Sequence, residues 1–572
     1  MSLLKRHLLS GNQAVALAAK HAHVALGTGY PGTPSTEILE EFNLLGGKAQ
    51  WAPNEKVALE VGIGAAFGSV RAIVTMKHVG LNVAADPLFT SAYTGVSGSL
   101  VVVSADDPGM ASSQNEQDNR HYARAAGLPM FEPADSQEAY DFTIAAFELS
   151  QRWNIPVILR MTTRVCHSKS VVTPCECNLD APKPDFKRDR KGLVMIPSFA
   201  KVSHRKLRDK LKLIAAWNET CGLNKRDNRS QTLGIISSGI SAMYAREAAP
   251  QASHLRIAVT YPLPIELIRD FAKNVEKCVV VEEGDNYLLD SIRAEGIVAQ
   301  GKNEIYLFDE LNVERTAQII QGNVSPEPKP ALETPPKLCQ GCPYRPVFET
   351  LAKLDCIVTG DIGCYTLAVQ PPFNALDSCV CMGASIGVGL GLRHVLPEQQ
   401  AKRVVSVIGD STFVHSGITG LVEMMYNPPA TGHVLIILDN GTIAMTGLQD
   451  HPGTGRTLDR TDTCKVVYED LAKTLGVKNV YVLDPTLDRQ NFEDILKKSL
   501  SGTTPTVIIA RHACLLETPR RGDSSRDISV AAPADGLQHL SDSVVNVAFA
   551  GLGGQGVIMA SDILAEVMFA AG

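Results

Sequence analysis

The chain has 572 residues, of which 45% are hydrophobic and 20% charged, and its formal net charge is −7. At about 100–200 residues per domain, this length predicts three to five domains. The negative charge disfavours nucleic acid as the main partner. No apolar run could cross a bilayer, and the N-terminus lacks the apolar core and cleavage site of a signal peptide. We therefore expect a cytoplasmic protein that is not embedded in a membrane.

Residues 1–165 alternate short β-branched runs with segments of helical length. The runs are RAIVTMKHVG (71–80), LVVVSAD (100–106) and PVILRMT (156–162). This alternation predicts a parallel sheet with helices on both faces. The basic stretch that follows, at 166–230, is expected to be a solvated connector or helix. A docking face for an acidic partner is the alternative.

Two further α/β units follow along the chain. Residues 231–325 contain the strand-like runs TLGIISS and KCVVVEE, and a Pro-rich linker at 326–338 ends this unit. The third unit, 339–516, contains RVVSVIGD, HVLIILDN and PTVIIAR. A polar linker is expected at 517–543. Residues 544–572 begin another strand, Gly-rich loop and helix, which should pack on this protein or on a separate chain.

Two strands of the third unit end in residues that suit a magnesium ion. One ends at Gly409, Asp410 and Ser411, and the other ends 30 residues after Asp410, at Asn440. Both strand ends should open on the carboxyl edge of a parallel sheet, where ligands bind. Mg²⁺ prefers oxygen ligands, and Asp410, Asn440 and the carbonyl of Thr442 can supply them. This spacing is the signature of a thiamine diphosphate site, whose phosphate charge helix N-termini would stabilise.

A thiamine enzyme also needs a carboxylic acid against the aminopyrimidine ring, because the ring must reach a rare tautomer before the ylid forms. An apolar setting raises the pKa of such an acid. Glu55 begins an Ala/Gly-rich helix in the first unit and is our candidate. Glu60 on the same helix is a rival, and a solvated helix residue is the ordinary alternative for either.

The third unit opens on the motif Cys339-Gln-Gly-Cys342, in a chain with 13 cysteines. Without a secretion signal, these cysteines are expected to be thiols or metal ligands. The motif suits a zinc knuckle, a redox dithiol or half of an iron–sulfur site. A zinc ribbon would need a second Cys-x-x-Cys, which the sequence lacks. The tighter pair Cys379-Val-Cys381 leaves a dithiol open, but the neighbouring thiamine site favours an electron acceptor.

Several long motifs carry a family resemblance: YPGTPS, NEK at 54–56, MKHVGLNVAADP, SSQNEQDNR, CQGCPYR, DIGCYTL, CMGASIGVG, GDSTF and LDNGTIAMTG. They resemble the 2-oxoacid:ferredoxin oxidoreductases and are most similar to the large (alpha) subunits of the indolepyruvate-oxidising members. The resemblance covers about residues 10–165 and 335–515. It implies a multidomain α/β fold, in which pyrimidine-type and diphosphate-type parallel-sheet domains flank a transketolase-C-like domain at 231–325.

The resemblance also implies roles for single residues. Glu55 would activate the thiamine pyrimidine, and Thr33 would face the reacting centre and the substrate carboxylate. Lys77 and His78 would lie close to the cofactor or substrate, and Arg120 would pair with the substrate carboxylate. Magnesium would be held by Asp410, Asn440 and Thr442, and further cofactor contacts would come from Pro31, Gly32, Gly409, Ser411 and Met445.

One [4Fe–4S] cluster beside the thiazolium is implied as well, with Cys356 and Cys381 as fallback ligands. Its expected ligands are Cys339, Cys342, Cys364 and Cys514. The chain departs from the family pattern after this point. No cysteine follows Cys514 in the sequence, so we expect this chain to lack the ferredoxin-like module with the distal clusters. The final segment, GLGGQGVIMASDILAE, resembles the start of the family's small subunit.

The implied reaction is thiamine-dependent oxidative decarboxylation of a 2-oxoacid, with indolepyruvate or another arylpyruvate favoured. Coenzyme A would take up the acyl group, and electrons would pass through the cluster to a ferredoxin or a flavin partner. A small-subunit-like chain is an expected partner, in a dimer of this chain or of heterodimers. Non-oxidative decarboxylation, which needs no cluster, is one alternative. A catalytically incomplete docking subunit is another, against which the presence of Glu55 and the magnesium residues argues.

Overall fold

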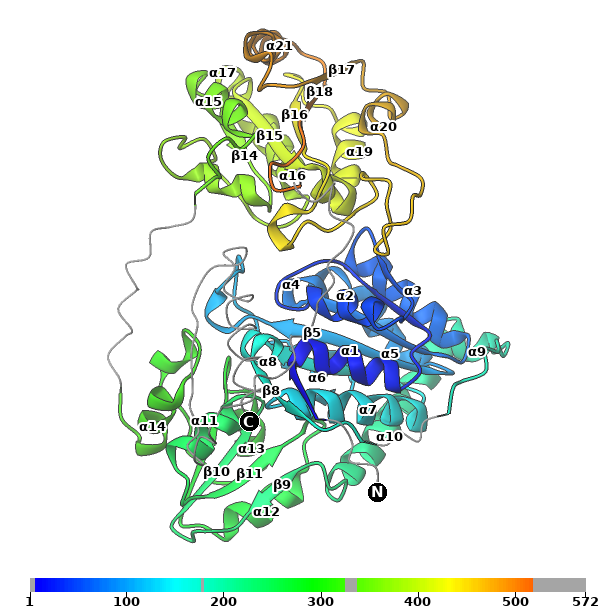
Figure 1. Cartoon of the computed structure of the whole chain (residues 1–572), viewed down its shortest axis with the longest axis vertical. Coiled ribbons are helices and arrows are strands. Elements are labelled where there is room, and N and C mark those ends of the chain that lie inside the picture. Colours follow the sequence, from blue (N-terminus) through cyan, green and yellow to red (C-terminus); the bar gives the residue numbers. More distant parts are fainter. Residues whose placement is uncertain (1–5, 176–179, 325–336, 518–572) are drawn as a thin grey trace, which may run out of the picture. The chain divides into compact units, whose positions relative to one another are not determined.

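A computed structural model describes residues 6–175, 180–324 and 337–517, which form two compact units (Figure 1). The described residues up to 324 belong to the first unit, and those from 337 onward belong to the second. The linker expected at 517–543 and the βα unit expected at 544–572 lie outside the described residues, as does most of the Pro-rich linker.

The first unit is built on a seven-stranded sheet. Its strands, in spatial order, are β12 (Val259–Tyr261), β6 (Met130–Phe131), β7 (Val157–Thr162), β5 (Ser99–Asp106), β4 (Arg71–Lys77), β2 (Leu26–Gly29) and β3 (Ala49–Trp51). Neighbouring strands are parallel except for β12 and β6, which are antiparallel. The parallel sheet predicted from the β-branched runs is therefore confirmed. Those runs form β4, β5 and β7, whose side chains are almost entirely buried.

Helices connect the strands of this sheet. They are α1 (Gly11–His21), α2 (Thr36–Leu44), α3 (Glu55–Phe67), α4 (His78–Val83), α5 (Ala85–Thr94), η1 (Pro108–Met110), α6 (Arg120–Ala126), α7 (Ser136–Trp153) and α8 (Thr163–His167). Local capping fixes several starts: Ser10 forms a capping box with Gln13, and the Asp135 carboxylate accepts a hydrogen bond from the Glu138 amide. A two-stranded antiparallel pair, β1 (His7–Ser10) and β8 (Lys169–Val172), lies beside α8 and α7.

The basic stretch contains α9 (Arg190–Leu193) and the long helix α10 (Pro197–Asn218). Of the two ordinary structures expected for this stretch, the helix is therefore confirmed. The buried residues of α10 recur at intervals of about four, as an amphipathic helix requires: Ser203, Leu207, Leu211, Ile214 and Asn218. Its lysines and arginines lie on the other faces and are mostly exposed.

A second, four-stranded sheet follows in the first unit. Its order is β13 (Lys277–Val281), β10 (Leu233–Ser238), β11 (Ser253–Ile257) and the antiparallel edge strand β9 (Lys225–Asp227). Apolar cores cover both faces. The accompanying helices are α11 (Ser241–Ala248), α12 (Ile265–Lys273), α13 (Tyr287–Ala294), η2 (Glu304–Leu307) and α14 (Val313–Gln321).

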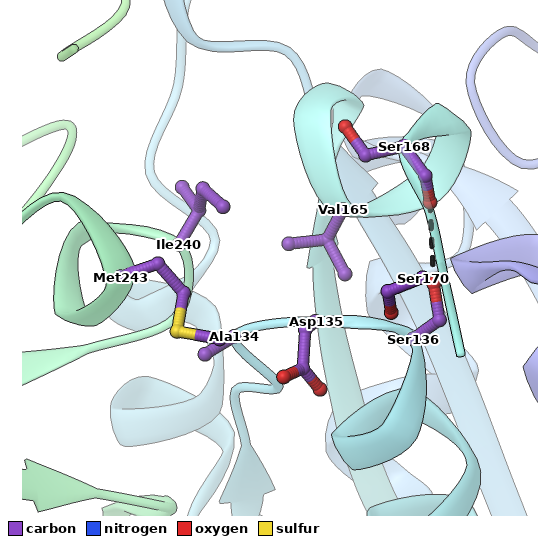
Figure 2. A pocket seen from close by; sticks show the side chains of 8 residues that line it. All are labelled: Ala134, Asp135, Ser136, Val165, Ser168, Ser170, Ile240 and Met243. Atoms are coloured by element: carbon purple, nitrogen blue, oxygen red, sulfur yellow. Dashed lines mark hydrogen bonds between the residues drawn. The ribbon is translucent and has the colours of Figure 1, made fainter. Parts of the chain in front are cut away.

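The two sheets of the first unit belong together, because β12 leaves the second α/β region and pairs with β6 of the first sheet. Figure 2 shows the seam between these regions, where Val165 faces Ile240 and Met243 of the α11 region. The pocket there has a volume of about 90 Å³. That is room for a few water molecules and far too little for a cofactor.

The second unit is a five-stranded parallel sheet in the order β14 (Ile357–Thr359), β15 (Val404–Gly409), β16 (Val434–Asp439), β18 (Thr506–Arg511) and β17 (Asn479–Leu483). Apolar cores again lie on both faces. Its helices are α15 (Arg345–Lys353), η3 (Cys364–Val369), α16 (Ala384–Val395), α17 (Glu398–Ala401), α18 (Asp410–Thr412), the π-turn η4 (Phe413–Gly417), α19 (Ile418–Tyr426), η5 (Ala444–Thr446), α20 (Tyr468–Thr474) and α21 (Arg489–Ser501). Within the described ranges, no helix is long and apolar enough to span a membrane.

Candidate active site

The YPGTPS loop follows β2 at the carboxyl edge of the first sheet. The Gly32 amide donates a hydrogen bond to Thr36 Oγ1 at 3.0 Å, which folds the loop onto the start of α2. A Cβ placed on Gly32 would stand 3.1 Å from the Cβ of Lys77, so the loop lies directly against the end of β4. Pro31 is buried and Thr33 is partly exposed. The structure thus brings the predicted Pro31–Thr33 segment and Lys77 to one place.

Glu55 is the first residue of α3, next to the Asn54 side chain that caps this helix. Its side chain is 5% exposed and packs against the backbone of α4, where a Cβ on Gly80 would stand 2.6 Å from the Glu55 Oε1. The rival Glu60 has a side chain that is 44% exposed and pairs with Lys56 one turn earlier. Only Glu55 therefore has the enclosed setting that its expected role requires.

Lys77 and His78 stand at the junction of β4 and α4. The Lys77 ammonium donates to the Ser112 carbonyl at 2.7 Å, and burial lowers its pKa to about 8. The His78 ring is completely buried, and its Nε2 lies 3.1 Å from the Asn115 carbonyl oxygen. Nε2 must therefore carry the proton, which leaves Nδ1 as a buried acceptor that has no hydrogen-bond partner among the described residues. Burial, followed by the charge of Lys77, lowers the pKa of His78.

Arg120 does not lie free beside Lys77 and His78, as its predicted role would require. Its side chain is fully buried, and its donors are taken by the carboxylates of Asp118 and Glu282 and by the carbonyl of Glu283. It joins α6 of the first sheet to the loop after β13 of the second. We therefore correct the expectation that Arg120 pairs with a substrate carboxylate. The SSQNEQDNR motif supplies an internal ion pair instead.

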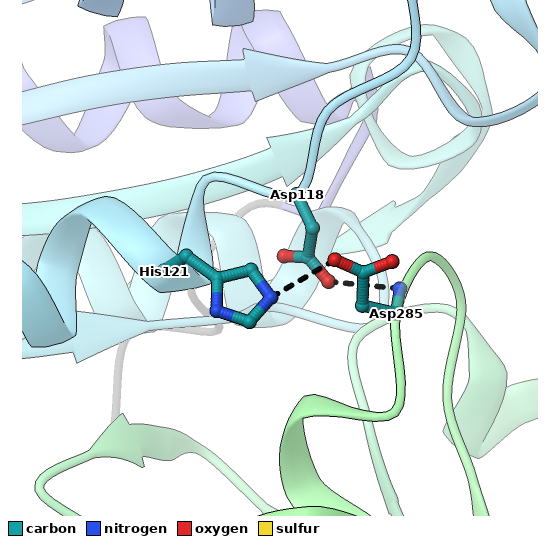
Figure 3. A group of neighbouring side chains, drawn as sticks. All are labelled: Asp118, His121 and Asp285. Atoms are coloured by element: carbon teal, nitrogen blue, oxygen red, sulfur yellow. Dashed lines mark hydrogen bonds and ion pairs between the residues drawn. The ribbon is translucent and has the colours of Figure 1, made fainter.

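Figure 3 shows Asp118 with His121 and Asp285, a group whose ligand atoms lie close enough together to hold a metal ion. Protein contacts already use these atoms. Asp118 is paired with Arg120 and lies 3.6 Å from Arg160, and the His121 Nε2 lies 2.9 Å from the Asp285 carboxylate. Because guanidinium groups already neutralise the buried carboxylate, this group is an ion-pair network of the fold.

The predicted magnesium residues meet at the carboxyl edge of the second unit's sheet. β15 and β16 run parallel, and Asp410 and Asn440 follow their last residues. The Asp410 carboxylate accepts hydrogen bonds from the amides of Ser411 and Gly441, each at 2.9 Å. The Asn440 side-chain oxygen accepts from the Thr442 amide at 3.2 Å. Strand ends far apart in sequence are thus joined directly, as the spacing predicted.

The chemistry of these residues fits a magnesium diphosphate. Asp410, Asn440 and Thr442 are all buried and offer hard oxygen atoms, the ligand type that Mg²⁺ prefers. The backbone amides that bind Asp410 leave lone pairs free on both carboxylate oxygens. Met445 lies nearby in sequence on η5 and is 49% exposed. The buried ring of His451, which sequence reasoning did not single out, lies 3.4 Å from Asp410.

The four expected cluster cysteines lie together in the second unit. A Cβ on Gly341, inside the Cys-x-x-Cys loop, would stand 3.3 Å from a methyl group of Leu515, which follows Cys514. Burial and, after it, the neighbouring thiols of Cys342, Cys514 and Cys339 raise the pKa of Cys364 to about 11. The Cys514 amide also donates to the carbonyl of Asn440 at 3.1 Å, so this group adjoins the magnesium residues.

The two fallback cysteines lie elsewhere. Cys356 immediately precedes β14 and is therefore at the amino edge of the sheet, where Arg403 and Asp355 act on its thiol. Cys381 has Asp361 as its charged neighbour and is exposed. The four expected cysteines therefore lie together, whereas neither fallback cysteine lies with them.

Two buried tyrosines connect the cysteine group with the magnesium residues. The rings of Tyr344 and Tyr365 meet edge to face, with centroids 6.2 Å apart. The Tyr365 hydroxyl accepts a hydrogen bond from the Gly409 amide at 2.9 Å. Burial raises the pKa of Tyr344, and Asp410 and Cys342 add to the effect, so this ring adjoins both groups. The motifs CQGCPYR and DIGCYTL contain these tyrosines, but only their packing shows this position.

Comparison with known proteins agrees with this arrangement. Residues 17–207 match the family described as "Pyruvate flavodoxin/ferredoxin oxidoreductase, thiamine diP-bdg", and residues 361–510 match "Thiamine pyrophosphate enzyme, C-terminal TPP binding domain". The indolepyruvate oxidoreductase subunit IorA of Archaeoglobus fulgidus is 38% identical over 544 residues, which are 89% of this chain and 86% of that protein. The chain belongs to the IorA family. The IorA subunit of Thermococcus kodakarensis is 35% identical over 90% of this chain and 86% of its own length.

This IorA-family chain is a subunit of a thiamine-diphosphate-dependent 2-oxoacid oxidoreductase, and the resemblance seen in its motifs is confirmed. The expected α/β fold with thiamine-binding parallel sheets is confirmed as well. A solved structure of 2-oxoglutarate:ferredoxin oxidoreductase from Magnetococcus marinus aligns with a TM-score of 0.47 and 16% identity, over 55% of this chain and 64% of that one.

Proposed function

We propose that this subunit oxidatively decarboxylates an aryl 2-oxoacid of the indolepyruvate type and passes the electrons through one [4Fe–4S] cluster to an external acceptor. The hydrogen bond from the Cys514 amide to the Asn440 carbonyl carries this proposal most directly. It joins a cluster cysteine to a magnesium residue, so a redox group and the cofactor would adjoin. A non-oxidative decarboxylase would have no use for such a junction.

Thiamine diphosphate, when bound, supplies the carbanion chemistry that accepts electrons from a 2-oxoacid. In our proposal, Asp410, the Asn440 side chain and the Thr442 carbonyl hold its Mg²⁺. Gly409 and Ser411 flank the carboxylate and shape this edge. Glu55 contacts the aminopyrimidine ring, because it combines a carboxyl group with an enclosed position at a helix start. An acid in such a setting can share a proton with a ring nitrogen.

The substrate would be held by Lys77, His78 and Thr33. The Lys77 ammonium is the cation of this group, and with a pKa of about 8 it is mostly charged at neutral pH, as binding of a carboxylate requires. His78 is neutral and keeps a buried acceptor nitrogen, which can take a proton from a bound group. The preference for an arylpyruvate rests on the names of the IorA relatives.

The cluster would be held by four thiolates that already lie together: Cys339, Cys342, Cys364 and Cys514. Burial and mutual repulsion raise the pKa values of Cys342 and Cys364 to about 11, so the free thiols resist ionisation. Bound iron would stabilise the thiolates and so offset the free-energy cost of ionising these buried thiols. Coenzyme A would accept the acyl group. The electrons would pass to a ferredoxin or a flavin protein. The chain would work with a small-subunit-like partner, in a dimer of this chain or of heterodimers.

Anaerobic spectroscopy of the purified complex tests this function. Iron and sulfide should be present, and indolepyruvate should bleach the cluster absorbance in the presence of thiamine diphosphate. Titrations with several 2-oxoacids, with and without coenzyme A, would rank the substrates and test the acyl acceptor. Absence of iron after anaerobic purification would overturn the oxidoreductase reaction in favour of simple decarboxylation. Bound iron without substrate-dependent bleaching would indicate a docking subunit.

A further inference from the structure

His451 lies in the loop after β16, beyond the magnesium residues. Its side chain is 2% exposed, although no carboxylate or carbonyl within the described residues accepts a hydrogen bond from its Nε2. The loop around it is well defined, because the His451 carbonyl accepts hydrogen bonds from both the amide and the hydroxyl of Thr454, at 2.8 and 2.9 Å. A polar atom enclosed this completely is costly unless it has a partner.

The protonation of this ring follows from its neighbours. The Gly453 amide donates a hydrogen bond to Nδ1 at 3.2 Å, so Nδ1 is the acceptor and Nε2 carries the proton. Gly453 also allows the ring to lie where it does. A Cβ there would overlap the Tyr468 hydroxyl and stand 2.9 Å from the His451 Cε1. The backbone thus holds the Nε2–H donor of His451 in a fixed position.

This donor lies beside the predicted magnesium residues. Nε2 lies 3.4 Å from the Asp410 Oδ2, near the carboxylate but outside hydrogen-bond geometry. That oxygen already accepts a hydrogen bond from the Gly441 amide at 2.9 Å. A protonated nitrogen cannot be a metal ligand, and Mg²⁺ prefers oxygen in any case. The natural partner for an enclosed N–H beside a magnesium carboxylate is an anionic oxygen that the same metal binds.

We propose that His451 is a phosphate-binding residue of the cofactor site, which donates its Nε2–H to the diphosphate of thiamine diphosphate. The inference rests on the proposed magnesium site at Asp410 and adds a residue to it. His451 acts as a hydrogen-bond donor and takes no part in the chemistry at the thiazolium. Its contribution is therefore to affinity for the phosphate end of the cofactor.

Binding measurements on the full chain, purified with its partner subunit and stripped of cofactor, test this role. His451→Met fills a similar volume without a donor, and His451→Gln keeps an N–H. His394→Met, at an exposed position of α16, is the matched control. Each protein is titrated by calorimetry with magnesium pyrophosphate, with thiamine diphosphate plus Mg²⁺, and with thiamine, which has no phosphate.

Loss of one hydrogen bond to a charged oxygen should weaken binding of magnesium pyrophosphate and thiamine diphosphate to His451→Met by about tenfold or more. Thiamine affinity should not change, and His451→Gln should recover most of the loss. Pyrophosphate affinity of His451→Met within twofold of wild type would overturn the inference. So would equal losses for pyrophosphate and thiamine, since these indicate a packing role.

The Asp410→Asn variant distinguishes a failure of the His451 inference from a failure of the proposed magnesium site on which it rests. If Asp410→Asn abolishes pyrophosphate binding while His451→Met leaves it intact, only the role of His451 is lost. If Asp410→Asn binds magnesium pyrophosphate as tightly as wild type, the proposed magnesium site itself is wrong. If His451→Met does not fold, the comparison of His451→Gln with wild type decides, and a tenfold loss there would contradict a donor role.

Discussion

Replacing Gly80 with alanine should displace Glu55 at little cost to the fold. Gly80 lies inside α4, and a Cβ there would stand 2.6 Å from both Cγ and Oε1 of Glu55. Favourable contacts between such atoms need about 3.5 Å, so the carboxylate must move by about 1 Å. Alanine is favoured over glycine by about 1 kcal/mol within a helix, which offsets part of the cost of that shift. The perturbation therefore falls mainly on the position of Glu55.

We expect Gly80→Ala to lower the turnover of the complex by about 100-fold, because a misplacement of about 1 Å can cost that much. The assay is anaerobic, substrate-dependent reduction of a viologen dye, with the melting temperature measured in parallel. Gly64→Ala on α3 is the control, since no atom of the described residues lies within 4 Å of the added methyl group. It should keep full activity and should not lower the melting temperature.

A double-mutant cycle shows whether the loss passes through Glu55. In a Glu55→Ala background, the added methyl group meets no carboxylate, so Gly80→Ala should cause no further loss. Two results would refute the reasoning. One is wild-type turnover in Gly80→Ala. The other is the same fold loss with and without Glu55, which would mean that Gly80 acts through another contact.

Three further predictions follow from single side chains. Lys77 has a pKa of about 8, so it loses its charge as the pH rises through 8, and KM for the 2-oxoacid should rise there. In Lys77→Arg, KM should stay flat over the same range because guanidinium remains charged; parallel profiles would contradict the role. Cys364→Ser should lose most of its iron by elemental analysis, whereas Cys356→Ser should keep it; equal iron contents would exclude Cys364 as a ligand. Arg120→Met leaves Asp118 and Glu282 buried without their guanidinium. It should lose about 3–5 kcal/mol in urea unfolding and leave KM unchanged, and an unchanged unfolding midpoint would count against the ion-pair network.

The sequence could predict that the proposed magnesium residues lie together, because their positions follow from local rules. A parallel sheet brings the ends of its strands to one edge, so Asp410 and Asn440 had to lie near each other once both strands were recognised. The four cysteines were assigned through family motifs, and the structure gathers them. The β-branched runs were sufficient to predict β4, β5 and β7, since buried parallel strands are apolar on both faces.

Other features depend on contacts between distant parts of the chain, which no local pattern contains. The sequence alone left Arg120 available to bind a substrate carboxylate. In the fold, its guanidinium donates a hydrogen bond to Glu282, which is 162 residues away. Glu55 and Glu60 share a helix, and only packing against Gly80 separates the enclosed acid from the exposed one. β12 pairs with a strand of another region, and its three residues are too short to show this in sequence.

The sequence by itself determined the fold class and the family and supplied the candidate site residues, because strand ends, glycine loops and cysteine motifs are local patterns. Only the tertiary structure decided which of several equivalent residues are enclosed, and which polar atoms are left without a protein partner. His451 is the clearest case. Its ring lies beside Asp410 because Gly453 and Tyr468 pack around it, and its Nε2 is enclosed without a hydrogen-bond partner among the described residues. The physical reason is that burial and hydrogen-bond satisfaction belong to the whole fold.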